Sequence, residues 1–457
     1  MIIFLVLITL AAASIALFAG VQGPLITILG IVIAAGWLLK RPLHAIGTAM
    51  ALQIWGVLSL TSDGMATPYK LGIVVAAIAT FGKILTVRRF ESLPRAYTTG
   101  LVLLMLNICI SEINAPYGSS LQSFVEFGST VFLFFLVSQL IRKPDDFRTI
   151  AIIQAIGLTF MTVYVVAEVG WSAMMAGIIR ARGPAGQPNA LAEHISRTMP
   201  FALALLLDTR NRTFVRALGS VAFVGSIYML FASASRGGAV GLSVGLITML
   251  ALSARTGFGR ILGVATASAV ILVVVAIAPK SFEDRVVGVV KGDERERDPT
   301  SHRLEQYAMA RPMLTAQPMI GHGVTGFPTV AGRESHEGNP ALHSSIIGMA
   351  VAYGFPAALI LIVLMLSGFL VAARAGNDSD AGRLYAYGLA SGTLAGFVCS
   401  FSSPTLFQPS LWFMASCCHV LAHHVRPRRA EAPEGAAQRL AGPQRIHGPL
   451  MARRGRA

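Results

Sequence analysis

Apolar runs alternate with short polar connectors along almost the whole chain. Each run extends for about 15 to 20 residues, close to the roughly 20 helical residues that cross a bilayer core about 30 Å thick. The runs cover residues 2–20, 25–39, 43–61, 71–87, 98–111, 123–141, 149–170, 190–207, 217–233, 238–253, 261–278, 346–373, 384–402 and 407–422. The pattern therefore predicts an all-α polytopic membrane protein with about 12–14 transmembrane helices.

The polar connectors are of two kinds, which alternate along the chain. The basic connectors are Lys40–Arg41, Arg88–Arg95, Arg142–Lys143, Asp208–Arg212, Arg255–Arg260, Arg374–Arg383 and the tail after Val425, whereas residues 62–68, 111–121 and 402–409 contain no Lys or Arg. Basic residues beside membrane spans normally mark the cytoplasmic side. We therefore expect both termini in the cytoplasm and the connectors without Lys or Arg on the opposite side. The first run has no basic segment before it and no small-residue cleavage site after it, so we expect a first span there and not a signal peptide.

One long hydrophilic insert interrupts the apolar pattern. It extends from about Pro279 to Ala341 and has eight Lys or Arg and nine Asp or Glu residues. Within it, the spacing of apolar residues predicts a short helix over 303–314, and Gly321, Gly323 and Gly326 predict a tight turn. The expected organisation is a transmembrane bundle (1–278), a loop with short helices on the outer side (279–345), further transmembrane helices (346–423) and a disordered basic cytoplasmic tail (424–457).

The composition excludes several classes of protein. Of the 457 residues, 54% are hydrophobic and 13% are charged, whereas a soluble domain carries about 25% charged residues. A soluble enzyme, a disulfide scaffold and a disordered chain are therefore excluded. The net charge of +15 favours membrane lipids and not nucleic acid as the partner, because much of it lies in the tail beside the last span. The four cysteines fall inside apolar runs and suit packing, and no spacing of ligands indicates a metal site.

Four groups of polar residues lie where the membrane should not tolerate them. They are Arg180 and Arg182 with Asn189 and the following Glu193, His194 and Arg197; Ser235 and Arg236 with Gly237; Ser301, His302 and Arg303; and His343, Ser344 and Ser345. The alternation of charge puts all four groups on the outer side. Ionisable groups at such positions are candidates for function.

Several arginines and one histidine at the mouth of a helical bundle suit a particular chemistry. Arginine binds phosphate oxygens with two parallel hydrogen bonds, so several arginines suit a diphosphate. Histidine can accept a proton from an attacking hydroxyl at neutral pH. A lipid diphosphate donor, a hydroxyl acceptor and transfer without a metal or cofactor fit this set best.

Each group also has a structural interpretation. Arg180 and Arg182 can anchor the end of a span by extending toward the head groups. Glu193, His194 and Arg197 can form an ion-pair network that holds helices together. Arg236 can be a turn residue, Arg303 can pair with Glu305, and His343 can cap the helix that follows it. His302, His322 and His336 suit surface positions better than zinc ligation.

Taken together, these segments resemble the O-antigen ligase and polymerase superfamily of bacterial envelope glycosyltransferases. The resemblance covers residues 180–356 and rests on five short features. They are Gln187–Ala192 after a basic segment, Ser235-Arg236-Gly237 at a span end, Arg303 with Tyr307 one turn on, the Pro318–Gly323 turn, and His343-Ser344 with Gly354 ten residues after Ser344. Gln187 replaces an Asn of the family pattern, and Ala357 stands where the ligases prefer Gly, Thr or Tyr, which weakens the choice of ligase over polymerase.

The resemblance implies a type C glycosyltransferase of the bacterial inner membrane that uses an undecaprenyl-diphosphate-linked glycan. It implies His343 as the general base, Arg180 or Arg182, Arg236 and Arg303 as diphosphate ligands, and a metal-independent, inverting reaction at the periplasmic face. Asn189, Ser235, Gly321, Gly323 and Ser344 are the expected supporting residues. The acceptor is lipid A-core or a similar lipid or glycan for a ligase, a second lipid-linked glycan for a polymerase, and a protein for a protein-glycosylating member. A lipid-linked glycan transporter is the alternative of another class.

Overall fold

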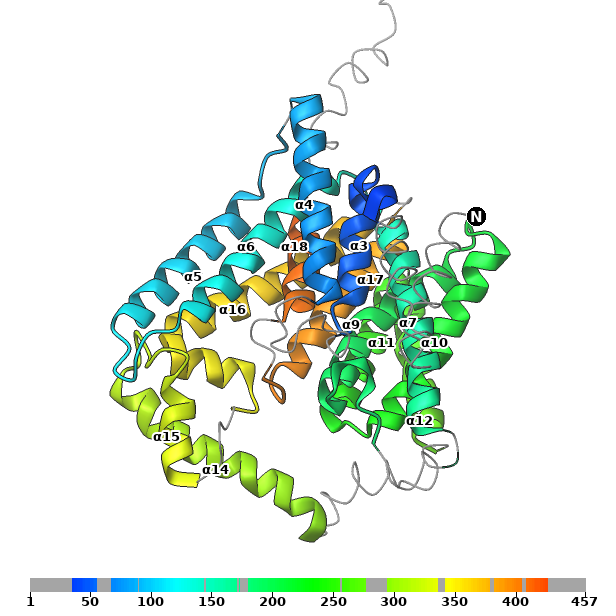
Figure 1. The fold of residues 1–457 in the computed structure, drawn as a ribbon. Coiled ribbons are helices and arrows are strands. Elements are labelled where there is room, and N and C mark those ends of the chain that lie inside the picture. The colour runs from blue at the N-terminus through cyan, green and yellow to red at the C-terminus, as the bar shows by residue number, and fades with distance from the viewer. Residues whose placement is uncertain are drawn as a thin grey trace, which may run out of the picture.

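The computed structural model describes residues 35–55, 67–88, 90–143, 145–170, 172, 180–254, 257–276, 294–335, 342–378, 382–404 and 408–425. All regular secondary structure in these ranges is helical (Figure 1), so the predicted all-α class is confirmed. The helices are α3 (Pro42–Leu52), α4 (Pro68–Val87), α5 (Arg95–Ile113), α6 (Leu121–Leu140), α7 (Asp146–Val169), the 3₁₀-helix η2 (Gly183–Ala185), α9 (Pro188–Leu207), α10 (Thr213–Ser233), α11 (Arg236–Ser253), α12 (Gly257–Ala276), α14 (Glu294–Ala316), α15 (Gly326–Ser335), α16 (Ser345–Asn377), α17 (Arg383–Cys399) and α18 (Pro409–Val425). The apolar run 2–20, most of 25–39, the start of the insert and the tail after Val425 lie outside the described residues.

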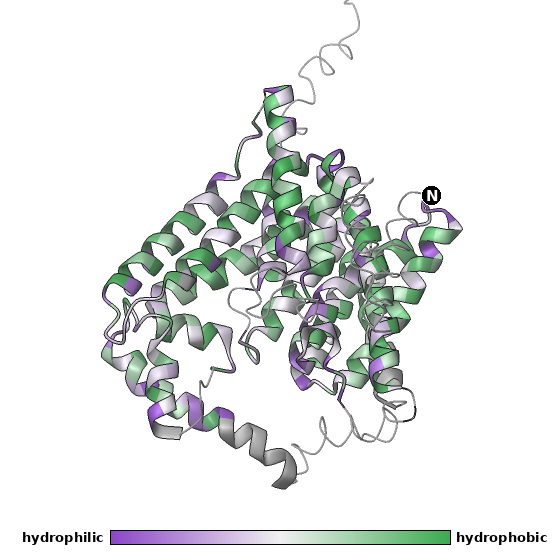
Figure 2. Cartoon of the chain, in the orientation of Figure 1, coloured by the Kyte–Doolittle hydropathy of each residue, from purple (hydrophilic) through white to green (hydrophobic). Residues whose placement is uncertain are grey.

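Seven of the described helices are long and apolar enough to cross a membrane. They are α4, α5, α6, α7, α10, α11 and α16. Their outward side chains are apolar: on α4, Val74, Ile78 and Leu85 are 53%, 57% and 75% exposed. Figure 2 shows hydrophobic residues along the lengths of these helices. A surface of this kind suits lipid better than water, so the chain is a multi-pass membrane protein.

α9 lies at the centre of the bundle, in contact with α7, α10, α11 and α17. Its residues from Leu191 to Leu205 are buried, including the charged Glu193 and Arg197. Small residues on its neighbours allow this close packing, as in many membrane bundles. A side-chain carbon at Gly219 of α10, for example, would lie 2.8 Å from the backbone oxygen of Ala202.

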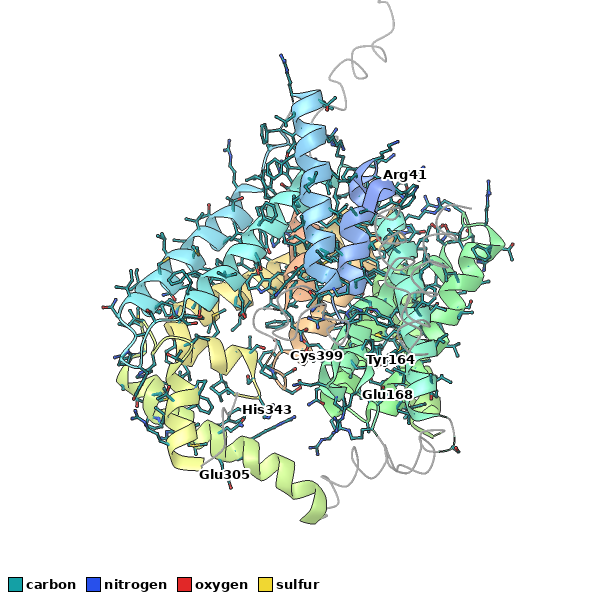
Figure 3. The ribbon with its side chains drawn as sticks, viewed as in Figure 1. Arg41, Tyr164, Glu168, Glu305, His343 and Cys399 are labelled. Carbon is teal, nitrogen blue, oxygen red and sulfur yellow. The ribbon has the colours of Figure 1, made fainter. Side chains whose placement is uncertain are left out.

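The connections gather at two opposite ends of the bundle. One end, which we call the basic end, carries the described residues of 40–42, 88–95, 141–146, 208–213 and 377–385. Its connections are tied together by the Arg142–Glu91 ion pair at 3.2 Å and by the hydrogen bond from Arg148 to Asn211 at 2.7 Å. The other end, which we call the insert end, carries residues 112–121, 180–189, 233–238, 317–326, 342–345 and 400–404. Figure 3 shows Arg41 at the basic end and His343, Glu168 and Cys399 toward the insert end. The two groups of connectors distinguished by charge thus lie at different ends.

The insert contains two helices. The helix predicted over 303–314 is present as part of α14, which begins earlier, at Glu294. The charged residues of its first turns have no apolar periodicity to reveal a helix, but Glu and Arg are good helix formers. Residues 279–293 and His336 lie outside the described residues, as do the side chains of Ser301 and His302.

The Gly-rich turn of the insert packs against a break in α16. Gly354 has a positive φ of 82°, and Pro356 follows it, so the helical hydrogen bonds are interrupted there. The freed backbone groups find partners in the turn: the N–H groups of His322 and Gly323 donate to the oxygens of Val351 and Ala352 at 2.9 and 2.8 Å. In the opposite direction, the N–H of Phe355 donates to the backbone oxygen of Pro318 at 2.8 Å. Since buried backbone groups need partners, the break and the turn stabilise each other, and α16 changes direction there (Figure 1).

Candidate functional site

Arg180 closes the end of α10. Its Nε donates to the backbone oxygen of Ser233 at 2.9 Å, and one terminal nitrogen contacts the oxygen of Ala234 at 3.5 Å. The last carbonyl groups of a helix lack partners within the helix and carry partial negative charge. Ala234 turns the chain with a positive φ of 47°, directly before Ser235 and Arg236. Two of the predicted groups, 53 to 56 residues apart in sequence, therefore lie side by side.

Arg182 lies beside an exposed carboxylate at the end of the neighbouring helix α7. The Glu168 carboxylate of α7 accepts the backbone N–H groups of Arg182 and Gly183 at 3.2 and 2.9 Å. The backbone is held in this way while the Arg182 side chain stays exposed. These hydrogen bonds hold the Arg182 backbone in place and leave its guanidinium group accessible.

Asn189 and Ser235 join the starts of α9 and α11. The Ser235 hydroxyl lies 3.0 Å from Asn189 Oδ1, and it also accepts the N–H of Gly238 at 3.4 Å as the N-cap of α11. Arg236 is the first residue of α11 and is half-buried. At the next two positions a side chain would overlap Ser402 or Ala192, so only glycine allows α11 to approach.

α14 holds the backbone of His343. The Gln306 side-chain oxygen accepts the N–H of His343 at 3.3 Å, and the Tyr307 hydroxyl donates to its carbonyl oxygen at 3.4 Å. Arg303 lies one turn before Tyr307 on this helix and is half-buried. The third and fourth predicted groups are therefore neighbours as well.

The first residues of α16 are bound to the connection between α17 and α18. Ser344 is the N-cap of α16 and accepts the N–H of Ile347 at 3.3 Å. The N–H of Ser345 donates to the oxygens of Ser400 and Ser403 at 2.8 and 3.1 Å. The Ser345 hydroxyl donates to the oxygen of Ser403 at 2.7 Å.

The α17–α18 connection thus touches both halves of the candidate site. Ser402 contacts α11 beside Arg236, and Ser400 and Ser403 bind the helix that begins after His343. The described members of the four predicted groups lie at the insert end of the bundle, except for Glu193, His194 and Arg197, which lie further into the bundle on α9. The connection that joins them contributes no charged residue.

Gly321 and Gly323 support the site through the backbone of α16. Both have positive φ, 68° and 73°, which favours glycine. A side-chain carbon on Gly321 would lie 2.5 Å from the backbone of Ala352. Gly326 begins α15. These glycines place the insert on the helix that carries His343 at its start.

Some residues of the site were missed in the sequence analysis. Glu112 is 1% exposed and accepts the hydroxyl of Ser123 and the N–H groups of Ser120 and Val324 at 2.8 to 3.0 Å. The sequence feature that could have identified Glu112 is a carboxylate in a connector that contains no Lys or Arg. Glu168 at the end of an apolar run gave a similar signal, whereas Gln306 and Ser403 are ordinary polar residues that no pattern distinguishes.

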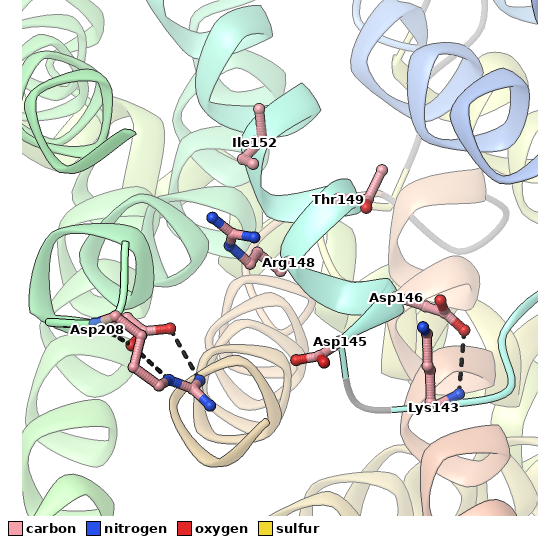
Figure 4. A pocket seen from close by; sticks show the side chains of 8 residues that line it. Lys143, Asp145, Asp146, Arg148, Thr149, Ile152 and Asp208 are labelled. Carbon is pink, nitrogen blue, oxygen red and sulfur yellow. Dashed lines mark hydrogen bonds and ion pairs between the residues drawn. The ribbon is translucent and has the colours of Figure 1, made fainter. Parts of the chain in front are cut away.

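A pocket at the basic end holds none of the predicted site residues (Figure 4). Its volume is about 370 Å³, and its lining comprises Lys143, Asp145, Asp146, Arg148, Thr149, Ile152, Asp208 and Arg210. Much of its charge is neutralised within the protein: Arg210 binds Asp208 through two hydrogen bonds of 2.9 Å, and Asp146 accepts the N–H groups of Arg142 and Lys143. Burial by itself would raise the pKa of Asp208, but the hydrogen bonds from Arg210 and Tyr385 hold this pKa below its ordinary value. We interpret this cluster as a tie between connections.

The fold and the candidate site define a multi-pass membrane protein whose functional candidates gather at one end of its helical bundle. Within the described residues, no group of three or more His, Cys, Asp or Glu side chains is arranged to hold a metal ion. Residues 221–362 match the family described as O-antigen ligase, which supports membership of the chain in the O-antigen ligase and polymerase superfamily. Among curated proteins, none matches the chain.

The matched region includes most of α10, all of α11, the insert and the first part of α16. It contains Arg236, Arg303 and His343, while Arg180, Arg182 and Asn189 precede it. The family supports a ligase- or polymerase-like glycosyltransferase activity.

Proposed function

We propose that this protein transfers a glycan from an undecaprenyl-diphosphate donor to a hydroxyl acceptor at the periplasmic face of the bacterial inner membrane. The acceptor is lipid A-core or a similar lipid. The insert end of the bundle is the periplasmic end, and both termini are cytoplasmic. The main support is the pair of contacts that the α17–α18 connection makes, one with α11 beside Arg236 and one with α16 beside His343. These contacts bring a fixed cation and an imidazole toward one region.

In this reaction His343 is the general base. Its ring accepts the proton of the acceptor hydroxyl while the hydroxyl oxygen attacks the anomeric carbon of the donor sugar. The bond between that carbon and the diphosphate oxygen breaks, and the electron pair leaves with the diphosphate. Attack from the side opposite the leaving group inverts the configuration at the anomeric carbon. The transfer needs neither a metal nor a cofactor, because arginine takes the place of a metal cation.

The arginines bind the diphosphate and stabilise the negative charge that develops as it leaves. Arg236 and Arg303 are half-buried, where a charge interaction is stronger than in water. The exposed side chain of Arg182 suits direct binding of the diphosphate, whereas the Arg180 side chain donates hydrogen bonds to backbone oxygens at the end of α10. We therefore assign Arg182, Arg236 and Arg303 to the diphosphate, and assign Arg180 to holding Ser235 and Arg236 in place.

The test is a His343→Ala variant in cells that lack the chromosomal copy of the gene. We expect loss of the surface glycan with continued production of the lipid-linked precursor, because transfer is blocked after the precursor is made. His423→Ala is the matched control, since His423 lies at the basic end, where its Nε2 is 2.8 Å from the Ser92 hydroxyl. Normal surface glycan in the His343→Ala cells would exclude this mechanism and favour a transporter.

A polymerase of the same superfamily is the alternative, and the acceptor distinguishes it from a ligase. Purified protein is incubated with an undecaprenyl-diphosphate-linked repeat, with and without lipid A-core. A ligase transfers one glycan to lipid A-core and forms no product in its absence. Ladders of longer glycans without lipid A-core would instead identify a polymerase.

A further inference from the structure

A buried ion pair lies in α9, below the candidate site. Arg197 and Glu193 are one turn apart, with 3.4 Å between Nη1 and Oε1, and both side chains are 1% exposed. Removing two charges from water costs several kcal/mol for each ion, and their attraction only partly offsets this cost. A pair in this position therefore calls for an explanation beyond stability.

Both members of the pair bind the α17–α18 connection. The second carboxylate oxygen of Glu193 accepts the Ser403 hydroxyl at 3.1 Å. The Arg197 Nη2 donates to the side-chain oxygen of Gln408. α17 leaves room for this: a side-chain carbon at Gly396 would lie 2.6 Å from Arg197 Cδ, and Gly392 packs on the Arg197 backbone. The two ends of the connection are thus tied to one helix at the centre of the bundle.

Ser403 passes this constraint to the start of α16. Its hydroxyl binds Glu193, and its backbone oxygen accepts the hydroxyl and the N–H of Ser345 at 2.7 and 3.1 Å. Ser345 is two residues after His343. On the insert side, two longer hydrogen bonds of 3.3 and 3.4 Å join the backbone of His343 to side chains of α14. The shorter bonds to the connection fix the first turn of α16 to the bundle.

We propose that Glu193 and Arg197 are positioning residues that hold Ser403, and through it the first turn of α16 with His343, at a constant place relative to Arg236. This inference rests on the proposed function, in which His343 is the base. Ser402 of the same connection packs against Gly237, next to Arg236, so one short segment sets the distance between base and cation. A displacement of about 1 Å between reacting groups can cost roughly 100-fold in rate.

The first test replaces Ser403 by Ala and measures turnover and undecaprenyl diphosphate affinity separately. Ser403→Ala removes the bond to Glu193 but keeps the backbone oxygen that Ser345 uses. We expect turnover to fall roughly tenfold or more, with affinity for undecaprenyl diphosphate within about twofold, because the diphosphate ligands are untouched. Hydrogen exchange at the Ser345 N–H should become faster, because Glu193 no longer holds in place the Ser403 backbone oxygen that this N–H binds.

Ser416→Ala is the matched control. Ser416 is a fully buried serine of α18 whose hydroxyl lies 3.3 Å from that of Tyr97. The Ser416→Ala variant loses one buried side-chain contact, as the Ser403→Ala variant does. Residue 416, however, lies away from the α17–α18 connection. Equal losses of turnover in the two variants, or no loss in Ser403→Ala, would overturn the proposal.

The second test removes the ion pair as a unit. The double variant Glu193→Leu with Arg197→Met keeps the volume and leaves no unpaired charge, and such replacements usually fold. We expect the turnover of this double variant to fall as it does in Ser403→Ala. Adding Ser403→Ala to the double variant should lower turnover no further, because the three residues hold the first turn of α16 through the same chain of contacts. Additive losses would contradict this shared chain of contacts. His343→Ala measured in the same assay separates the two proposals: if it is active, the proposed function fails; if it is inactive while Ser403→Ala is normal, only the positioning role fails.

Discussion

At the scale of single residues, the positive-φ glycines show how a short motif acts. Gly321, Gly323 and Gly354 each adopt a backbone conformation that L-residues rarely take, with φ from 68° to 82°. All three glycines belong to the short sequence features that resemble the O-antigen ligases, but the sequence does not show what each glycine packs against. The reason is the mutual docking of the Gly-rich turn and the break in α16.

Gly354→Ala should destabilise the protein strongly. The new methyl group would overlap the Met319 carbonyl oxygen, and the positive φ adds strain of about 1 kcal/mol or more. Gly348→Ala is the control in the same helix, because a side-chain carbon there meets nothing within 4 Å. Thermal unfolding in detergent should show a lower midpoint for Gly354→Ala and an unchanged or higher one for Gly348→Ala. A pair of equal midpoints would disprove the docking argument.

Arg303→Gln should weaken binding of undecaprenyl diphosphate about tenfold or more, because a charge-assisted hydrogen bond contributes roughly 1.5–3 kcal/mol. Arg311→Gln makes the same charge change two turns along α14, at an exposed position. Affinities measured in nanodiscs check both. If the two variants lose affinity equally, general attraction between cations and diphosphate explains the result, and Arg303 has no specific role.

At the scale of helices and connections, polar side chains decide which ends come together. From the sequence alone, Glu193, His194 and Arg197 are either functional residues or a network that holds helices together. The structure shows the Glu193–Arg197 pair bonded to the α17–α18 connection. Periodicity placed these helices in the sequence, but it carries no information on which connection each side chain meets.

The Asp208 cluster at the basic end predicts a pH dependence of stability. Because the folded pKa of Asp208 lies below its ordinary value of 3.8, the ionised form is favoured by folding. The stabilisation is therefore complete above the ordinary pKa and is lost as the pH falls through the lowered folded pKa. Thermal unfolding measures the difference in the free energy of unfolding between the unchanged protein and Asp208→Asn. This difference should be constant from about pH 8 to about pH 5 and should shrink below about pH 4. A difference that grows toward acid pH would contradict this sign.

At the scale of the whole molecule, the two ends of the bundle should face opposite sides of the membrane. Ser119 is exposed at the insert end and Thr213 is exposed at the basic end. With the partly buried Cys109 replaced by Ser, Ser119→Cys should react with a membrane-impermeant thiol reagent in cells with a permeable outer membrane. Thr213→Cys should react only after the inner membrane is disrupted. The reverse pattern would place the candidate site in the cytoplasm.

The pattern along the chain determined the all-α membrane class, the extents of most of the described helices and the grouping of connectors by charge. These features depend on local composition and on the thickness of a bilayer, so neighbouring residues suffice to predict them. The resemblance to the O-antigen ligases also followed from short motifs, and the family match supports it.

Only the tertiary structure decided which of these segments meet. Ser403 and Gln306 have no distinctive sequence context, yet their side chains and backbone reach His343 and its helix across 37 to 58 residues of chain. Arg180 looked like a ligand for phosphate, and its position at the end of α10 gives it a structural task. A hydrogen bond depends on distances of a few tenths of an ångström between residues far apart in sequence, and these distances are set by how the helices pack, which no local pattern records.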